Sequence, residues 1–275
     1  MKGGNKLKKI LMLVSLFLIC FAAGTCAEMM VDVEVGEKKL ALTSQPFISD
    51  GSVYVPLRAV SDALGIECDW SESDKSAYSE SENATVIFYP YRSYAKVNGK
   101  KEPLSMYIQN GSLMVPVRYL SECHGFSVDW DKTFYRVMID GGVKLPESMV
   151  DKTYNQDEVY WLSKIIHSES VGEIMEGQIA VGNVILNRVE SKDFPNTIYS
   201  VIFDKAGGVQ FEPVMNGSIY STPSHSSVEA AKRALSGENT AGNSLFFLNP
   251  KKAQSFWIVN TRSFYRSIGN HDFYL

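Results

Sequence analysis

Two segments in the second half of the chain carry the apolar spacing of helices that pack in a core. In residues 157–167, apolar side chains recur every three or four positions, at Val159, Leu162, Ile165 and Ile166. This spacing predicts a helix with one buried face. Residues 178–189 are apolar on nearly every side, which predicts a helix buried at the centre of a domain.

Shorter signals follow these two helices. Ser226 and Glu229 have the spacing of a capping box, which predicts the start of a further helix, and Gly237 marks its end. Residues 244–248 form a β-type run that an Asn-Pro pair stops. We therefore expect residues 157–275 to form an α+β domain in which helices dominate.

The first half of the chain instead carries an internal repeat. Residues 51–70 recur as residues 111–130, and nine of the twenty positions are identical. Each copy predicts a strand, a short helix and a second strand. Pro56 fits a helix start, where its missing N–H is no loss, and Gly65 fits a helix end. The repeat predicts a small α/β tandem module over residues 28–140.

A polar segment separates the two halves. Residues 141–156 mix glycine, proline and polar residues, a composition typical of linkers. We expect few contacts across such a boundary. With 275 residues the chain is long enough for two domains, so the expected organisation is the tandem module, the linker and then the helix-dominated domain.

The N-terminus carries the parts of a secretory signal. Four lysines make the first nine residues positive, residues 10–23 are apolar but short for a membrane span, and small residues precede Glu28. The pattern predicts a signal peptide over residues 1–27 and a secreted, extracytoplasmic protein. An uncleaved membrane anchor is the alternative.

The net charge and the cysteines indicate which ligands and which bonds to expect. A net charge of −4 does not indicate the basic surface that nucleic-acid-binding proteins carry. Cys20 and Cys26 fall within the predicted signal, so Cys68 and Cys123 are the cysteines expected in the mature chain. They are either joined by a disulfide or left as two buried thiols, and their spacing indicates no metal site.

The candidate chemistry lies where Glu169 and Glu173 stand four residues apart around a glycine. A carboxylate at the mouth of a buried helix is suited to general acid catalysis, because an apolar surround disfavours the charged form and raises the pKa. The alternative is an ordinary helix start, where the helix dipole favours glutamate. Spacing alone leaves both interpretations open.

The motifs around these glutamates occur in a fixed order. The pattern E-x-x-G-E spans Glu169 to Glu173, G-Q-x-A-V spans Gly177 to Val181, and N-R-V occupies residues 187–189. Further blocks are Phe194-Pro195, Gln210-Phe211, residues 245–250 and Ile268 to Phe273. In this order the motifs resemble the signature of the SleB/CwlJ-type cell wall hydrolases, the spore cortex-lytic enzyme family, over residues 157–275.

The resemblance implies a lysozyme-like or transglycosylase-like domain that cleaves the MurNAc–GlcNAc bond of peptidoglycan, in spore cortex or cell wall. Glu169 matches the family's catalytic acid. In a lytic transglycosylase one glutamate suffices, because the muramic acid 6-hydroxyl attacks C1. No cofactor or metal is expected. The expected supporting or substrate-binding residues are Glu173, Gln178, Asn187, Gln210, Phe211, Asn249, Trp257, Asn270 and His271, with Tyr220 and Phe247 as further candidates for sugar stacking.

Two other interpretations stay open. A zinc-dependent N-acetylmuramoyl-L-alanine amidase would need three protein ligands, and the candidates are His167, Glu169, His225 and His271. His167 and Glu169 are two positions apart, so a continuing helix would point them to different faces. A wall-binding protein with an inactive hydrolase domain is the non-catalytic alternative, which the complete set of motifs disfavours.

The tandem module resembles the copper amine oxidase N-terminal-like domain, a small non-catalytic module of secreted bacterial proteins. No copper is expected, because the module contains one histidine, His124. We expect Arg58 and Arg118 to pair with nearby carboxylates and Trp70 and Trp130 to lie in the core, with sugar stacking as the alternative. The module is interpreted as a spacer or wall-targeting domain, with wall or spore-coat proteins as candidate partners.

Overall fold

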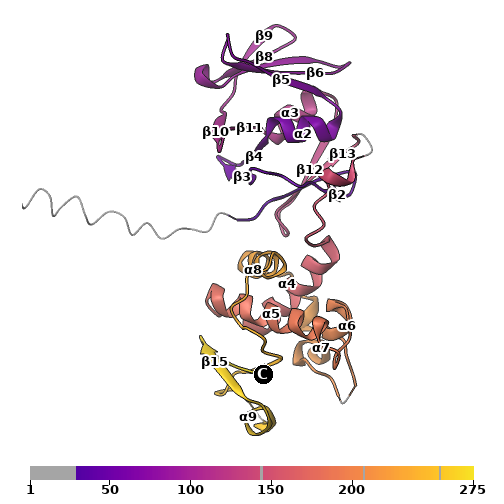
Figure 1. The fold of residues 1–275 in the computed structure, drawn as a ribbon, viewed down its shortest axis with the longest axis vertical. Coiled ribbons are helices and arrows are strands. Elements are labelled where there is room, and N and C mark those ends of the chain that lie inside the picture. The colour runs from indigo at the N-terminus through magenta and orange to yellow at the C-terminus, as the bar shows by residue number, and fades with distance from the viewer. Residues whose placement is uncertain (1–28, 143–144, 207, 254) are drawn as a thin grey trace, which may run out of the picture.

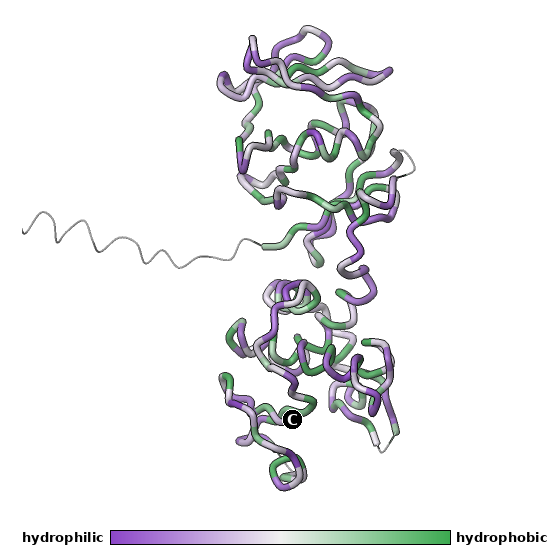
Figure 2. The backbone as a smooth tube through the Cα atoms, viewed as in Figure 1, coloured by the Kyte–Doolittle hydropathy of each residue, from purple (hydrophilic) through white to green (hydrophobic). Residues whose placement is uncertain are grey.

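The computed structural model describes residues 29–142, 145–206, 208–253 and 255–275, and the predicted signal peptide lies outside them. The chain forms a strand-rich N-terminal lobe and a helix-rich C-terminal lobe that follow one another along its longest axis (Figure 1). Each lobe has its own main cluster of buried apolar residues, and hydrophobic positions recur along the backbone of both (Figure 2). The predicted two-domain α+β architecture is confirmed. No helix in the described ranges is long and apolar enough to cross a bilayer.

The N-terminal module is built from short strands around two helices. Its strands are β1 (Asp32–Val35), β2 (Lys38–Lys39), β3 (Phe47–Ser49), β4 (Ser52–Pro56), β5 (Glu67–Ser71), β6 (Ser76–Glu80), β7 (Thr85–Tyr89), β8 (Tyr94–Val97), β9 (Lys100–Pro103), β10 (Tyr107–Gln109), β11 (Ser112–Pro116), β12 (Ser127–Asp131) and β13 (Arg136–Asp140). Its helices are α2 (Leu57–Leu64), α3 (Val117–Cys123) and the 3-10 turn η1 (Pro90–Arg92). The strands form sheets in the orders β12-β13-β1-β2, β10-β11-β4-β3 and β5-β6-β7-β8-β9.

The two copies of the repeat meet at β4 and β11. Val55 pairs with Val115 in antiparallel register, and both side chains are fully buried. In each copy a strand that ends in proline leads directly into a helix, and a second strand follows. Gly65 ends α2 with a φ of +71°, the left-handed conformation that glycine favours. The predicted strand–helix–strand order of each copy is confirmed.

The predicted ion pairs of Arg58 and Arg118 are confirmed, but one of the two tryptophans predicted in the core lies elsewhere. Arg58 Nη2 lies 3.1 Å from Asp69 Oδ1, and Arg118 Nη1 lies 2.8 Å from Glu122 Oε1. Trp130 is 36% exposed, so its assignment to the core is wrong. It lies on the edge strand β12 and packs edge-on against the ring of Tyr135 instead.

The other residues singled out in this module are Trp70, the two cysteines and His124, and each is at least half-buried. Trp70 is half-buried and packs against the apolar cluster of the module. Cys68 and Cys123 are free thiols, each half-buried. His124 is buried, and both of its ring nitrogens contact serine hydroxyls, Ser79 Oγ at 2.7 Å and Ser81 Oγ at 2.8 Å.

The C-terminal domain is a helical cluster with a small sheet at its end. Its helices are α4 (Gln156–Ser170), α5 (Met175–Glu190), α6 (Ile198–Ile202), α7 (Glu212–Asn216), α8 (His225–Leu235), α9 (Trp257–Thr261) and the 3-10 turn η3 (Ser218–Tyr220). Its strands β14 (Phe246–Leu248), β15 (Phe264–Ile268) and β16 (His271–Tyr274) form a sheet in the order β14-β16-β15. Helices α4, α5 and α8 pack on one another. Both long helices predicted from the apolar spacing are present.

The start of α8 differs from the prediction. Ser224 is the N-cap, and its hydroxyl accepts a hydrogen bond from the Ser227 N–H at 3.2 Å. Ser226 therefore lies inside the helix, and the predicted capping box with Glu229 is wrong. The Glu229 carboxylate instead accepts from the Met30 N–H at 2.9 Å. The Glu229 carboxylate, which the sequence pattern assigns to the helix start, is thus hydrogen-bonded to the other lobe.

The helices and strands of the two lobes pack little on one another, as expected, but the lobes meet in a buried polar contact that the linker composition did not predict. The Lys232 ammonium on α8 is fully buried and lies 3.0 Å from Asp32 Oδ2 on β1. It also donates to the Met30 carbonyl at 2.9 Å. Tyr154, from the predicted linker, donates to Asp32 Oδ1 at 3.0 Å, and Leu145 packs in the apolar cluster of the N-terminal module. The domain boundaries themselves stay a prediction.

Candidate active site

Glu169 lies in the last turn of α4, two residues beyond the predicted end of that helix. Ser168 and Ser170 donate their hydroxyls to the carbonyls of Lys164 and Ile166, at 2.9 and 2.8 Å. These bonds tie the final turn to the one before it. Residues 171–174 then turn the chain into α5. The Glu169 side chain is half-buried at this corner.

The carboxyl group of Glu169 has a perturbed charge environment. Burial, and then the nearby carboxylate of Glu212 at the start of α7, raises the pKa of Glu169 to about 7. No hydrogen bond or ion pair from the described residues offsets this effect. Near neutral pH the group therefore exists in both protonated and ionised forms, as a general acid requires. The expectation that burial raises this pKa is confirmed.

Exposed apolar side chains flank this end of α4. Val171 and Ile174 are largely exposed in the corner, and Met215 on α7 and Tyr220 on η3 are more exposed still. Helix α4 packs against both α7 and η3. Lys164 Nζ fixes η3 by donating to the Tyr220 carbonyl at 3.1 Å. Glu169 thus lies at a corner that exposed apolar side chains of the turn, α7 and η3 surround.

Glu173 occupies the same corner but is held by the C-terminal hairpin. Its Oε2 accepts from the Asn270 backbone N–H at 2.9 Å, and its Oε1 accepts from the Asn270 side-chain amide at 3.0 Å. His271 Nδ1 lies 3.8 Å from Oε1. Gly269 turns the hairpin with a φ of +60°, and a Cβ atom there would overlap Glu173 Oε2. The turn is therefore shaped around this carboxylate.

These contacts give Glu173 the opposite pKa shift from Glu169. Burial alone would raise the pKa of Glu173, but the two Asn270 hydrogen bonds, with His271 and Lys252, bring it below its usual value. Glu212, rather than Glu173, is the carboxylate that raises the pKa of Glu169. Glu173 has a structural role in the corner, because Asn270 engages both of its oxygens.

Gln178 and Asn187, both predicted to support the site, have their amides engaged in the scaffold. Gln178 Nε2 donates to the Glu173 carbonyl at 3.0 Å, and Gln178 Oε1 accepts from Ser227 Oγ at 3.0 Å. Asn187 Nδ2 donates to the carbonyls of Gly242 and Ser244 at 2.8 and 2.9 Å. These bonds join α5 to the start of α8 and to the loop before β14.

Phe211 is a core residue, so its ring is not exposed to a substrate. Its ring is buried and stacks on Phe247 at 6.5 Å between centroids. The guanidinium of Arg188 lies 5.2 Å from the ring centre. Burial lowers the pKa of Arg188 to about 10, and its Nε donates to the Leu245 carbonyl at 2.7 Å. The Gln210 side chain, next to Phe211, is exposed and donates to the backbone of its own loop.

The remaining predicted residues lie at the C-terminal end of the chain. Asn249 Oδ1 accepts from the Lys251 N–H at 3.0 Å, which is a turn-capping bond. Trp257 on α9 is half-exposed and packs edge-on against Phe246. His271 is buried, and its Nδ1 has no hydrogen-bond donor or acceptor within the described residues. Among these, only Asn270 and His271 contact the corner that carries Glu169 and Glu173.

The candidate zinc ligands are not brought together. His167 Nδ1 accepts from the Ser224 N–H at 3.2 Å, and His225 Nδ1 contacts the Tyr135 hydroxyl at 2.6 Å across the lobe boundary. His271 faces Glu173. In the part of the chain that the structure describes, no three His, Cys, Asp or Glu side chains form a group able to hold a metal ion.

Glu212 is the residue of this site that the sequence analysis missed. Its position just before Pro213 is a signal for a helix start, since proline and acidic residues both favour the first turn. That signal locates α7 along the chain but says nothing of its distance from Glu169. The packing of α7 on α4 supplies that information.

Comparison with known sequences places this site within a class of proteins. The family model described as Cell Wall Hydrolase matches residues 172–274, and the Copper amine oxidase N-terminal domain model matches residues 34–139 and 101–182. A cell wall hydrolase CwlJ from Oceanobacillus iheyensis is 35% identical over 106 residues, which is 36% of this chain and 74% of that protein. The chain therefore belongs to the cell wall hydrolase family. The family match begins after Glu169 and includes Glu173 and Asn270.

Longer relatives share the same part of the chain. The spore cortex-lytic enzyme of Bacillus cereus is 40% identical over 124 residues, which is 45% of this chain and 46% of that enzyme. This chain thus spans less than half the length of that relative. A solved structure described as the catalytic domain of the germination-specific lytic transglycosylase SleB from Bacillus anthracis is 38% identical, and the match covers 46% of this chain and 100% of that one with a TM-score of 0.42.

Proposed function

We propose that this protein is a secreted enzyme that cleaves the MurNAc–GlcNAc bond of peptidoglycan as a lytic transglycosylase. The contrast between two carboxylates in one corner carries the proposal. Glu169 has a pKa of about 7 and no partner among the described residues, whereas Asn270 engages both oxygens of Glu173. The names of the similar proteins, spore cortex-lytic enzyme and cell wall hydrolase, support peptidoglycan as the substrate.

In the proposed reaction Glu169 acts first as an acid and then as a base. Its neutral form donates a proton to the glycosidic oxygen while the bond from that oxygen to C1 of MurNAc breaks, so the GlcNAc end leaves as an alcohol. The resulting carboxylate stabilises positive charge at C1. The 6-hydroxyl of the same MurNAc then attacks C1 and returns its proton to Glu169. No water is consumed, and a 1,6-anhydro end forms.

The charge environment of the corner suits this cycle. A pKa near the working pH lets one group donate a proton and later accept one at comparable rates. Burial and Glu212 supply that pKa. Glu173 is too strongly hydrogen-bonded to serve as a nucleophile or a base in the same step. A mechanism with one glutamate therefore fits the corner best.

Hydrolysis is the second candidate reaction, and Glu212 is the observation that favours it. Its carboxylate is near enough to Glu169 to raise the pKa of that residue. In an inverting glycosidase a second carboxylate activates water on the opposite face of the sugar. Such a reaction would leave a reducing end in place of the anhydro end.

Mass spectrometry of the products from purified peptidoglycan tests both candidates. The wild-type protein is expected to release anhydro-ended fragments. Glu169→Gln is expected to lower the rate by about 10²–10⁴-fold, because the amide cannot donate the proton. Glu190→Gln, an exposed glutamate on α5, serves as the matched control and should act like wild type.

Other products would indicate a different reaction. Reducing ends would favour hydrolysis with Glu212, and free stem peptides would favour the amidase. A Glu169→Gln variant that keeps more than about a tenth of the activity would remove Glu169 from the role of acid. The proposed setting of the reaction is extracytoplasmic, in cell wall or spore cortex, and wall or spore-coat proteins are the proposed partners of the N-terminal module.

A further inference from the structure

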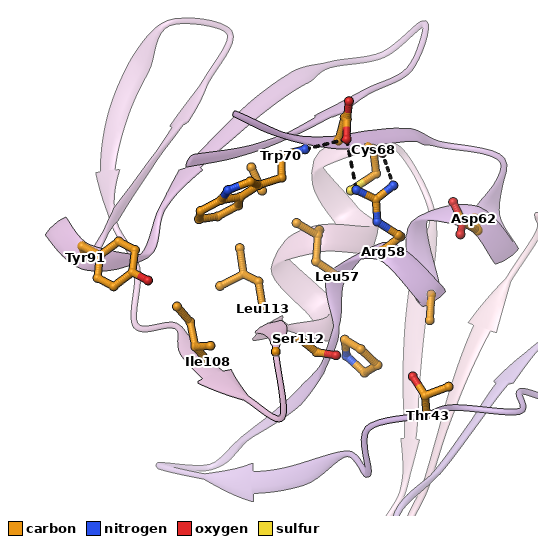
Figure 3. Close-up of a pocket in the computed structure, with 15 residues that line it drawn as sticks. Thr43, Leu57, Arg58, Asp62, Cys68, Trp70, Tyr91, Ile108, Ser112 and Leu113 are labelled. Carbon is orange, nitrogen blue, oxygen red and sulfur yellow. Dashed lines mark hydrogen bonds and ion pairs between the residues drawn. The ribbon is translucent and has the colours of Figure 1, made fainter. Parts of the chain in front are cut away.

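The N-terminal module contains a pocket of about 520 Å³. It is lined from α2, β5 and β11, with η1 and β10 at its edge (Figure 3). This volume is within the range of small-molecule binding sites. The proposed reaction at Glu169 does not use this pocket, because all of its lining residues belong to the other lobe.

One end of the pocket is apolar and aromatic. Trp70, Tyr91, Ile108 and Leu113 surround it (Figure 3). Tyr91 is 69% exposed, and Ile108 is about half exposed. Neither Trp70 nor Tyr91 pairs with another aromatic ring of the described residues. The exposed Tyr91 ring and the half-buried Trp70 ring therefore offer a surface for a flat apolar group at the mouth of the pocket.

The other end is polar and held in place. Arg58 donates to the Cys68 carbonyl at 3.0 Å and to Asp69 at 3.1 Å, so its guanidinium is fixed beside the pocket. Asp62, one turn further along α2, is exposed and has no ion pair among the described residues. Thr43 adds a hydroxyl on the opposite side (Figure 3). The pocket thus combines an aromatic end with fixed donors and free acceptors.

The second copy of the repeat uses the equivalent residues differently. Arg118 pairs with Glu122 on its own helix rather than with the strand that follows. Trp130 packs against Tyr135, and the Tyr135 hydroxyl contacts His225 of the other lobe. The fold of the repeat therefore does not require a pocket at this position. The pocket is not symmetric in the repeat, because Arg58 and Trp70 of the first copy line it together with residues 111–113 of the second.

We propose that this pocket binds the N-acetylated amino sugars of a glycan strand and holds the polymer on the enzyme. A pyranose ring has a C–H face that packs on aromatic rings and a rim of hydroxyl and acetamido groups that bond to charged side chains. The two ends of the pocket match these two parts. The proposal rests on the proposed function, because that function makes the strand a substrate.

Binding of chitotetraose, a soluble tetramer of N-acetylglucosamine, to the full chain tests the pocket. The chain carries Glu169→Gln so that a bound saccharide is not processed, and calorimetry measures the dissociation constant. Adding Tyr91→Ala or Asp62→Asn is expected to weaken binding by about tenfold, from the loss of one ring contact or one charged acceptor. Adding Trp130→Ala, the repeat counterpart outside the pocket, should change it less than about twofold. Thermal unfolding checks that each variant is folded.

Three outcomes overturn the pocket proposal. The first is the absence of chitotetraose binding to the parent chain, and the second is binding that Tyr91→Ala and Asp62→Asn leave unchanged, which would place the saccharide elsewhere. The third is binding of a free stem peptide, lost in Tyr91→Ala, in place of chitotetraose, which would make this a peptide site.

A second measurement separates this proposal from the proposed function. In a chain that retains Glu169, Tyr91→Ala is expected to slow cleavage of insoluble peptidoglycan while leaving cleavage of short soluble glycans unchanged. If wild type releases no glycan fragments but Tyr91-dependent saccharide binding persists, the pocket stands and the proposed function fails. If wild type cleaves both substrates and Tyr91→Ala cleaves both equally well, the function stands and the pocket proposal fails.

Discussion

Asn270 donates to both carboxylate oxygens of Glu173, with its backbone N–H at 2.9 Å and its side-chain amide at 3.0 Å. The two residues are 97 positions apart. Their contact joins the turn of the C-terminal hairpin to the corner between α4 and α5. Of the two glutamates in the motif, this contact engages Glu173 and leaves Glu169 available for chemistry.

Asn270→Ala is expected to lower the free energy of unfolding by about 1 kcal/mol, because one hydrogen bond to a charged acceptor is lost while the backbone donor stays. Denaturant unfolding measures the change. Asn243→Ala, at an exposed asparagine with no side-chain hydrogen bond in the described residues, is the control. Equal stability of the two variants would show that the side-chain contact is not stabilising.

Gly269→Ala is expected to destabilise the protein more than Asn270→Ala. The added Cβ would overlap Glu173 Oε2, and alanine is strained at a φ of +60°. The same unfolding experiment gives the comparison. Gly237→Ala, at a positive φ but with open space around it, isolates the backbone strain. The excess loss in Gly269→Ala then measures the overlap, and no excess would contradict the described geometry.

The activity is expected to depend on pH through Glu169. The acid must be protonated to donate, so the rate should fall as the pH rises through about 7. Glu212→Gln removes the carboxylate that helps to raise this pKa, so the alkaline limb of the profile should move to lower pH. Initial rates on soluble glycan across pH give the limb, with Glu190→Gln as the control. An alkaline limb that stays in place or moves to higher pH would mean that Glu212 does not act on the catalytic acid.

Lys232→Met is expected to cost about 3 kcal/mol of stability, because the buried Asp32 carboxylate loses its nearer cation and keeps only Lys39, whose Nζ lies 3.6 Å from Oδ1. Adding Asp32→Asn should recover part of this loss, since no buried charge then lacks a partner. Lys100→Met removes an exposed partner of Glu102 and should change stability by less than about 1 kcal/mol. Urea unfolding of the four proteins distinguishes these effects. A loss no larger than that of the Lys100 variant would contradict a tight interface.

Removal of residues 28–154 is expected to leave a folded hydrolase domain that begins with the α4 N-cap, Asn155. Its Tm should fall by several degrees, because Val159 and Val228 lose the cover of Tyr154 and Phe134. Activity on short soluble glycans should remain. Calorimetry and a glycan assay test both points, and aggregation of the truncated chain would show that the two lobes form one folding unit.

The sequence alone determined the features whose signals are local. The apolar spacing of residues 157–167 and 178–189 specified α4 and α5, since a helix buries positions three and four apart. The proline before each repeat helix and Gly65 after the first one specified the strand–helix–strand order. The raised pKa of Glu169 also followed from sequence, because the buried helices on either side of it predict an apolar surround.

Only the tertiary structure decided how these parts meet. The two glutamates of the motif look alike in sequence, and Asn270 and Glu212, which set them apart, come from distant segments. The polar composition of residues 141–156 suggested a linker without tertiary contacts. In the structure, however, Tyr154 and Lys232 both contact the buried Asp32 carboxylate. Local pattern reports which face of an element is apolar. Hydrogen bonds and ion pairs between distant residues depend on where packing brings each side chain, and a local pattern does not encode that position.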